Sequence, residues 1–94
     1  MRFTEQKKKF KQDLKRESRG RYRNVIRGEL WDVIDALAND VMLDPSYQDH
    51  ALHHNWEGSR ECHLAFDFLL VYTLEGDDVL ILERLGSHSE IFEL

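Results

Sequence analysis

The spacing of the apolar residues changes once along this chain of 94 residues. In the first part they recur every three or four positions, which is the spacing of one face of a helix. The clearest series is Ile26, Leu30, Val33, Ile34, Leu37 and Val41. From residue 60 onward apolar residues alternate with polar ones or form short branched and aromatic runs, as strands do. This succession of patterns predicts an α+β fold.

The first part predicts two helices joined at Gly20, a residue that commonly follows a helix end. Phe3, Phe10 and Leu14 mark a narrow apolar stripe on the first helix, and the second helix runs from near Tyr22 to Val41. Residues 1–3 are a weak candidate for a strand. The two helices should form a hairpin whose apolar faces pack on the rest of the chain.

The second part predicts three strands after a long loop, residues 42–54, that carries the turn sequence Asp-Pro-Ser. The strands are Arg60–Ala65, Phe68–Leu74 and Val79–Leu85, with a bend at 66–67, a hairpin turn at 75–78 and one helical turn within 87–94. We therefore expect one domain, residues 1–94, in which an N-terminal helix hairpin packs on one face of a small antiparallel sheet. Residues 1–41 are mainly helical and 42–94 mainly strands.

Charge is divided unevenly along the chain. Residues 1–29 hold eleven Lys or Arg against four Asp or Glu, whereas residues 30–94 hold two against fourteen. A basic front on an acidic body suggests one positive surface that meets a polyanion. A solvated charged helix is the alternative reading of Lys7, Lys8 and Lys9.

No apolar run is long enough to cross a bilayer, and the first residues are unlike a signal peptide. A lone cysteine, Cys62, cannot form an internal disulfide. These features fit a cytoplasmic protein with no membrane partner.

All five histidines fall between residues 47 and 92, together with acidic groups and two arginines. His63 and Asp67 are four residues apart, and so are Arg84 and His88. Because the strand ends can gather at one edge of the sheet, such groups could cleave a phosphodiester by acid–base chemistry. Each also has a structural reading. Zinc is a further alternative, with ligands drawn from His50, His53, His54 and His63.

Several segments in their order resemble the YafQ-type toxins of the RelE/ParE superfamily. The matching residues are 47–52 (YQDHAL), 56–60 (WEGSR), His63, Asp67, 70–72 (LVY), 83–88 (ERLGSH) and Phe92. The likeness is close over about half of the chain and extends to the helical part only in layout.

This resemblance implies a bacterial toxin of a type II toxin–antitoxin pair that cleaves mRNA in the ribosomal A site. It implies the RelE/ParE fold, metal-independent catalysis without a cofactor, and three partners: a cognate antitoxin, the ribosome and mRNA. The expected catalytic residues are His50, His63, Asp67, Arg84 and His88. The expected substrate-binding residues are Phe92, Phe68, Arg60, Lys7, Lys8 and Lys9.

Two positions depart from the family pattern: Phe68 stands where the best-known relative has tryptophan, and Glu57 replaces a basic residue. A non-catalytic, ParE-like inhibitor of DNA gyrase is the alternative function, because the superfamily shares one fold across both activities. The histidine set favours the nuclease, since a gyrase inhibitor does not need it.

Overall fold

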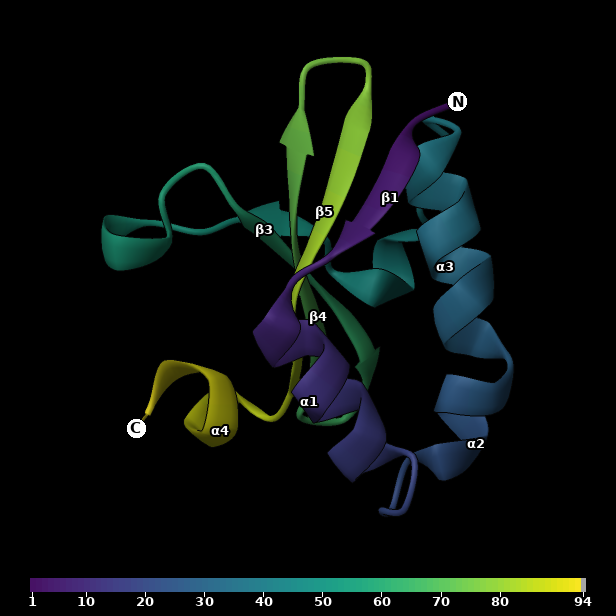
Figure 1. Cartoon of the computed structure of the whole chain (residues 1–94), viewed down its shortest axis with the longest axis vertical. Helices are drawn as coiled ribbons and strands as arrows, with labels where there is room; N and C mark the ends of the chain where they lie inside the picture. Colours follow the sequence, from purple (N-terminus) through teal and green to yellow (C-terminus); the bar gives the residue numbers. More distant parts are fainter. Residues whose placement is uncertain (94) are drawn as a thin grey trace.

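A five-stranded sheet runs through the computed structural model, which describes residues 1–93 (Figure 1). The strands are β1 (Phe3–Gln6), β2 (His50–Ala51), β3 (Arg60–Ala65), β4 (Phe68–Glu75) and β5 (Val79–Gly86), in the order β1-β5-β4-β3-β2. Strands β2 to β5 pair antiparallel, whereas β1 pairs parallel with β5. The predicted antiparallel sheet is therefore wrong at one edge, where residues 3–6 make the sheet mixed.

Within the same residues there are four α-helices and two short 3-10 turns. The helices are α1 (Lys8–Glu17), α2 (Arg23–Arg27), α3 (Glu29–Ala38) and α4 (His88–Phe92), and the turns are η1 (Pro45–Tyr47) and η2 (His54–Trp56). Gly28 divides the predicted second helix, because its φ of −139° and ψ of −80° lie outside the helical region. The helix hairpin is not confirmed: α1 packs along β5, and α2 and α3 pack on each other.

The larger core lies between these helices and one face of the sheet. The strands contribute Cys62, Leu70, Tyr72, Leu80, Leu82 and Leu85, and the helices Phe10, Leu30, Val33, Ile34 and Leu37. Burying one large apolar side chain contributes about 1.5–3 kcal/mol. This face therefore holds the helices on the sheet.

Because successive strand residues point to opposite faces, the same strands present a second set of side chains on the other side. Leu69 and Val71 of β4 form a smaller core there with Ile91 of α4. Strand β4 is thus covered on both faces, as its run of apolar residues predicts. Helix α4 starts at a capping box in which Ser87 and Glu90 satisfy each other's backbone N–H groups.

Within residues 1–93, no helix has the length and apolar content needed to span a bilayer.

Candidate active site

Three histidines surround one buried carboxylate on the second face of the sheet. Glu61 lies on β3, is only 3% exposed, and its Oε2 atom is 3.0 Å from His63 Nε2, 3.3 Å from His50 Nε2 and 3.5 Å from His88 Nε2. The ring centroids of His50 and His63 are 6.0 Å apart, and those of His63 and His88 are 5.6 Å apart. Residues from β2, β3 and α4 thus meet at one point. His50 lies next to Glu61 because the two residues are paired between β2 and β3.

The orientation of two of these rings follows from their Nδ1 partners. His50 Nδ1 lies 2.6 Å from the Gln48 carbonyl oxygen, which can only accept, so this nitrogen carries the proton. His88 Nδ1 lies 2.9 Å from Asp67 Oδ1. In both rings the Nε2 atom therefore faces Glu61 and is available to take or give a proton.

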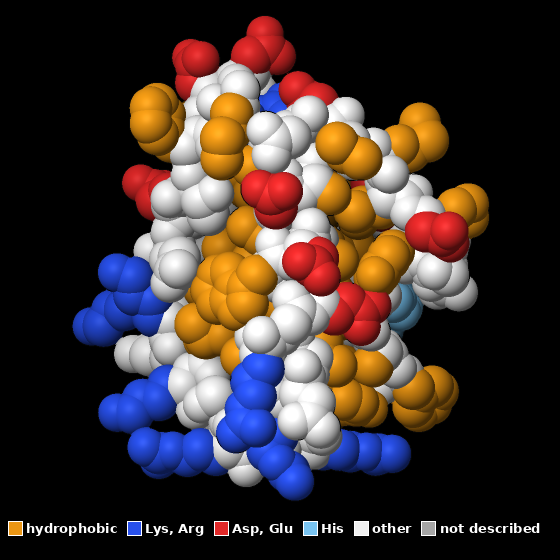
Figure 2. All heavy atoms as spheres, turned by 90° about the vertical axis from the view of Figure 1, so that its right-hand side faces the viewer, with side chains coloured by type: hydrophobic (Ala, Val, Ile, Leu, Met, Phe, Trp, Pro, Cys, Tyr) orange, Lys and Arg blue, Asp and Glu red, His pale blue; other side chains and the backbone are white. Residues whose placement is uncertain are grey.

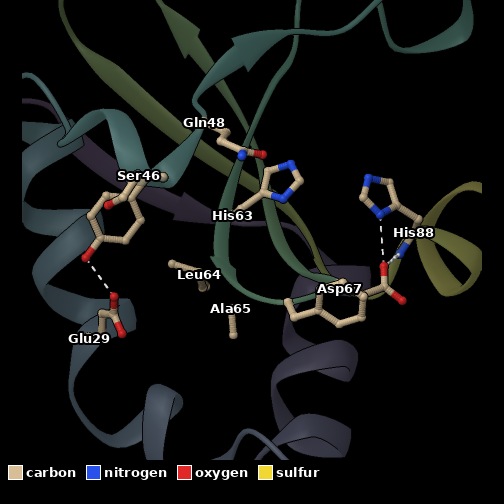
Figure 3. A pocket seen from close by; sticks show the side chains of 10 residues that line it. Glu29, Ser46, Gln48, His63, Leu64, Ala65, Asp67 and His88 are labelled. Atoms are coloured by element: carbon tan, nitrogen blue, oxygen red, sulfur yellow. Dashed lines mark hydrogen bonds and ion pairs between the residues drawn. The ribbon is translucent and has the colours of Figure 1, made fainter.

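Asp67 is placed by the tight turn between β3 and β4, where its φ of 52° is left-handed, a conformation that aspartate tolerates. Its Oδ1 atom accepts hydrogen bonds from both the backbone N–H and the ring of His88 (Figure 3). These bonds, the backbone one first, hold the pKa of Asp67 below its ordinary value. The carboxylate therefore stays charged at neutral pH and orients His88.

A pocket of about 630 Å³ opens beside this cluster (Figure 3). Its lining residues are Glu29, Ser46, Tyr47, Gln48, His63, Leu64, Ala65, Phe66, Asp67 and His88. The side chain of Tyr47 is held there by a 2.7 Å hydrogen bond from its hydroxyl to Glu29, which raises the pKa of Tyr47 to about 12. Side chains that can accept or donate protons therefore border this cavity.

Arg84 does not line this pocket. Its Nε and Nη2 atoms lie 2.7 and 3.2 Å from the carboxylate oxygens of Asp13 on α1, and only 14% of the side chain is exposed. Arg84 sits opposite Val71, which sits opposite Glu61, so two strand spacings, about 10 Å, separate the backbones of Arg84 and Glu61. The guanidinium is therefore separate from the histidine pocket, although the sequence predicts that these groups gather at one edge of the sheet.

The lysine segment lies near Arg84. Lys7, Lys8 and Lys9 line a small groove with Trp56, Arg84 and the acidic Glu83. The Trp56 ring in turn meets that of Phe92 edge-on at 5.9 Å, and the Phe92 ring lies 6.0 Å from that of His88. A path of basic and aromatic side chains thus leads from the start of α1 to the histidine cluster.

Two expected substrate-binding residues lie elsewhere. Phe68 is 1% exposed in the larger core and stacks on Tyr22 at 4.7 Å, so it presents no surface to a ligand. Arg60 bonds to Asp49 at 3.3 and 3.4 Å and lines a separate cleft with Tyr72. Both residues were expected to bind substrate beside the histidines. Each instead lies on the strand face that points away from the histidines.

Sequence reasoning missed Glu61, although alternation along β3 already places it on the face of His63. Nothing in the local sequence distinguishes it from the other acidic residues of this half. Glu61 also adds a possible metal ligand to the site. The ligand atoms of His50, Glu61 and His63 lie within 4.8 Å of one another and could hold a metal ion. This donor set differs from the histidines suggested by sequence, since Glu61 replaces His53 and His54.

Residues 2–93 match the family described as the bacterial toxin of type II toxin–antitoxin systems, YafQ. The mRNA interferase toxin YafQ of Escherichia coli strain B is 38% identical over 56 residues, which are 60% of this chain and 60% of that protein.

Solved structures share the fold over almost the whole chain. A copper-bound mutant toxin from Helicobacter pylori has a TM-score of 0.84 and 40% identity, covering 98% of this chain and 100% of that one. The Escherichia coli DinJ–YafQ complex has a TM-score of 0.81 and 32% identity, covering 98% of this chain and 99% of that one.

Proposed function

The chain belongs to the YafQ family of toxins of bacterial type II toxin–antitoxin systems, and we propose that it is a ribosome-dependent endoribonuclease that cleaves mRNA in the A site. The relative from Escherichia coli strain B is named an mRNA interferase, which supports this activity. The observation that carries the proposal is the convergence of His50, His63 and His88 on Glu61, with Asp67 behind His88.

The reaction begins with removal of the proton from a ribose 2′-OH by one imidazole. The 2′ oxygen attacks the adjacent phosphorus, the bond from phosphorus to the 5′ oxygen breaks, and a protonated imidazole supplies a proton to that oxygen. The products are a 2′,3′-cyclic phosphate and a free 5′-OH. No redox partner is needed, and the proton gained by the base balances the proton lost by the acid.

His88 is our candidate for one proton step, because Asp67 fixes its ring and leaves Nε2 facing the cluster. His63 lies 5.6 Å away, centroid to centroid, and shares the complementary step with His50. Glu61 Oε2 faces all three Nε2 atoms, so it can accept a hydrogen bond from whichever ring carries a proton there.

Arg84 acts on the phosphate backbone in this proposal. Asp13 occupies its Nε and Nη2 atoms, so Nη1 is the guanidinium nitrogen that faces no partner among the described residues. Arg84 lines the groove of Lys7, Lys8 and Lys9 and is not among the residues that line the histidine pocket. It therefore serves a neighbouring phosphate rather than the ring that transfers the proton.

The basic surface supports contact with ribosomal RNA. Figure 2 shows Lys and Arg side chains gathered at the lower end of the molecule, where α1 and α2 lie in Figure 1, and acidic groups above them. Lys7, Lys8 and Lys9 lie next to Trp56 in a groove that leads toward Phe92. Replacing all three lysines by alanine should weaken ribosome binding and flatten its salt dependence, because each phosphate contact steepens that slope.

A cognate antitoxin is the third expected partner. The Escherichia coli relative was solved in complex with DinJ, which supports a comparable protein partner here. Both the ribosomal substrate and such a partner would act in the cytoplasm.

Inducible expression in a bacterial host tests the proposal, with primer extension to map cuts in cellular transcripts. Wild type should arrest growth and cut transcripts in frame, and His88→Ala should do neither. His53→Ala is the matched control, because His53 is exposed and lies outside the cluster. A toxic His88→Ala protein with intact transcripts would instead favour the gyrase inhibitor.

A further inference from the structure

The pocket beside the histidines extends well beyond the groups that move protons. Its far wall comes from α3 and the η1 turn, and it contains Glu29, Tyr47 and Gln48. Among the described residues that line it, none is a lysine or arginine. At this far wall a phosphate would meet the Glu29 carboxylate with no lysine or arginine to offset the repulsion, so this end of the pocket favours an uncharged group.

Phe66 is the most unusual lining residue, because its side chain is 88% exposed at the pocket edge. Its backbone is nevertheless tied down: the Tyr22 hydroxyl donates a 2.5 Å hydrogen bond to the Phe66 carbonyl oxygen, and the Tyr22 ring stacks on Phe68. Asp67, which orients His88, is the next residue in the same turn. An apolar ring is thus held on a fixed turn, one residue from the catalytic cluster.

Gln48 brings a neutral donor and acceptor to the other wall, where Figure 3 shows its amide near His63. Gln48 follows the η1 turn in a left-handed conformation, with φ at 50°. Its carbonyl oxygen accepts a hydrogen bond from His50 Nδ1. The position of Gln48 is therefore linked to that of a catalytic histidine. Leu64 and Ala65 add apolar surface between the two walls.

We propose that this pocket binds the nucleobase of a nucleotide that flanks the scissile phosphate, with the base stacked on Phe66 and its polar edge toward Gln48. A nucleobase combines an uncharged flat face with hydrogen-bonding edges, which is the chemistry that the lining offers. The proposal rests on the endoribonuclease function. It makes the pocket a determinant of which sequence is cut, separate from the groups that cut it.

Other exposed aromatic residues allow a matched control. Phe3 is 82% exposed on β1 and does not line the pocket. Phe66→Ala and Phe3→Ala should both keep the thermal midpoint of the wild type, because neither ring is buried. Phe66→Tyr keeps a stacking ring at the same place.

The test measures single-turnover cleavage by this protein of mRNAs bound to ribosomes. In each mRNA, the nucleotide on one side of the cut is either intact or abasic. One abasic position should slow wild type about 5- to 150-fold, the usual range for loss of one base–aromatic stack. Phe66→Ala should cleave intact mRNA more slowly than wild type by a similar factor. Its cleavage rate should fall little further when the mRNA is abasic. Phe66→Tyr and Phe3→Ala should behave as wild type. Gln48→Ala should change the order in which the four bases at that position are cleaved.

Two results overturn the base-binding pocket while leaving the nuclease intact. One is Phe66→Ala cutting intact mRNA at the wild-type rate. The other is an abasic penalty that is equally large with and without the Phe66 ring. If wild type and His88→Ala both leave every mRNA uncut, the endoribonuclease proposal itself fails, and the pocket proposal with it.

Discussion

Asp13→Ala should be among the most destabilising single changes in this protein. The Asp13 side chain is 3% exposed and accepts four hydrogen bonds: Arg84 Nε at 2.7 Å, Arg84 Nη2 at 3.2 Å, Leu85 N at 2.9 Å and Arg16 Nη1 at 3.0 Å. Removing it leaves the poorly exposed Arg84 cation and the Leu85 N–H without their partner. Breaking a buried pair in this way costs about 3–5 kcal/mol, against a total of about 5–15 kcal/mol for a small domain.

Urea unfolding followed by far-UV circular dichroism measures this loss as a lower midpoint at an unchanged slope. Asp32→Ala is the control, because Asp32 is exposed in the first turn of α3 and should cost less than about 1 kcal/mol. In a double-mutant cycle, Asp13→Ala with Arg84→Ala should cost clearly less than the sum of the single changes. A loss below about 1 kcal/mol for Asp13→Ala, or strictly additive effects, would refute the ion pair as a structural tie between α1 and β5.

Three further predictions follow from single groups. Burial raises the pKa of the Cys62 thiol to about 12, so Ellman's reagent at pH 8 should label it slowly in the folded protein and at once in urea. The hydrogen bonds from His88 lower the pKa of Asp67, so its stabilising effect is present above the unfolded value of about 3.9 and is lost as pH falls through the lower folded value. Asp67→Asn should therefore lessen the fall in stability below about pH 4, measured as thermal midpoint against pH. Gly86→Ala should cost about 1–3 kcal/mol in urea unfolding, because φ at Gly86 is +155° and a Cβ there would lie 3.0 Å from Arg16 Nη2.

Most of the strands could be predicted from sequence, because their signal is local. Alternation along Arg60–Ala65 predicts β3 with its observed bounds, and the predicted β4 and β5 each end one residue short. Residues 1–3 were only a candidate strand, and the parallel pairing of β1 with β5 was not predicted. Residues 3–6 pair with residues 79–82, and a four-residue segment carries too little pattern to indicate a partner so distant in the chain.

Part of the candidate site could likewise be predicted from sequence, and part could not. The resemblance carried over His50, His63, Asp67 and His88, and the structure brings these four residues together. That proximity supports their proposed roles, which the His88→Ala experiment tests. The role of Glu61 was not apparent from sequence, because a carboxylate gains its influence from burial and from neighbours on other strands.

The sequence by itself determined the α+β class, the segments of β3, β4 and β5, the family and the order of the histidines, since these depend on local spacing and residue type. Only the tertiary structure decided that Arg84 is held by Asp13, that Phe68 is buried and that Phe66 is exposed at the pocket. The physical reason is that a side chain's partner and exposure depend on contacts between residues far apart in the chain. Asp13 and Arg84, 71 positions apart, meet only because α1 packs along β5.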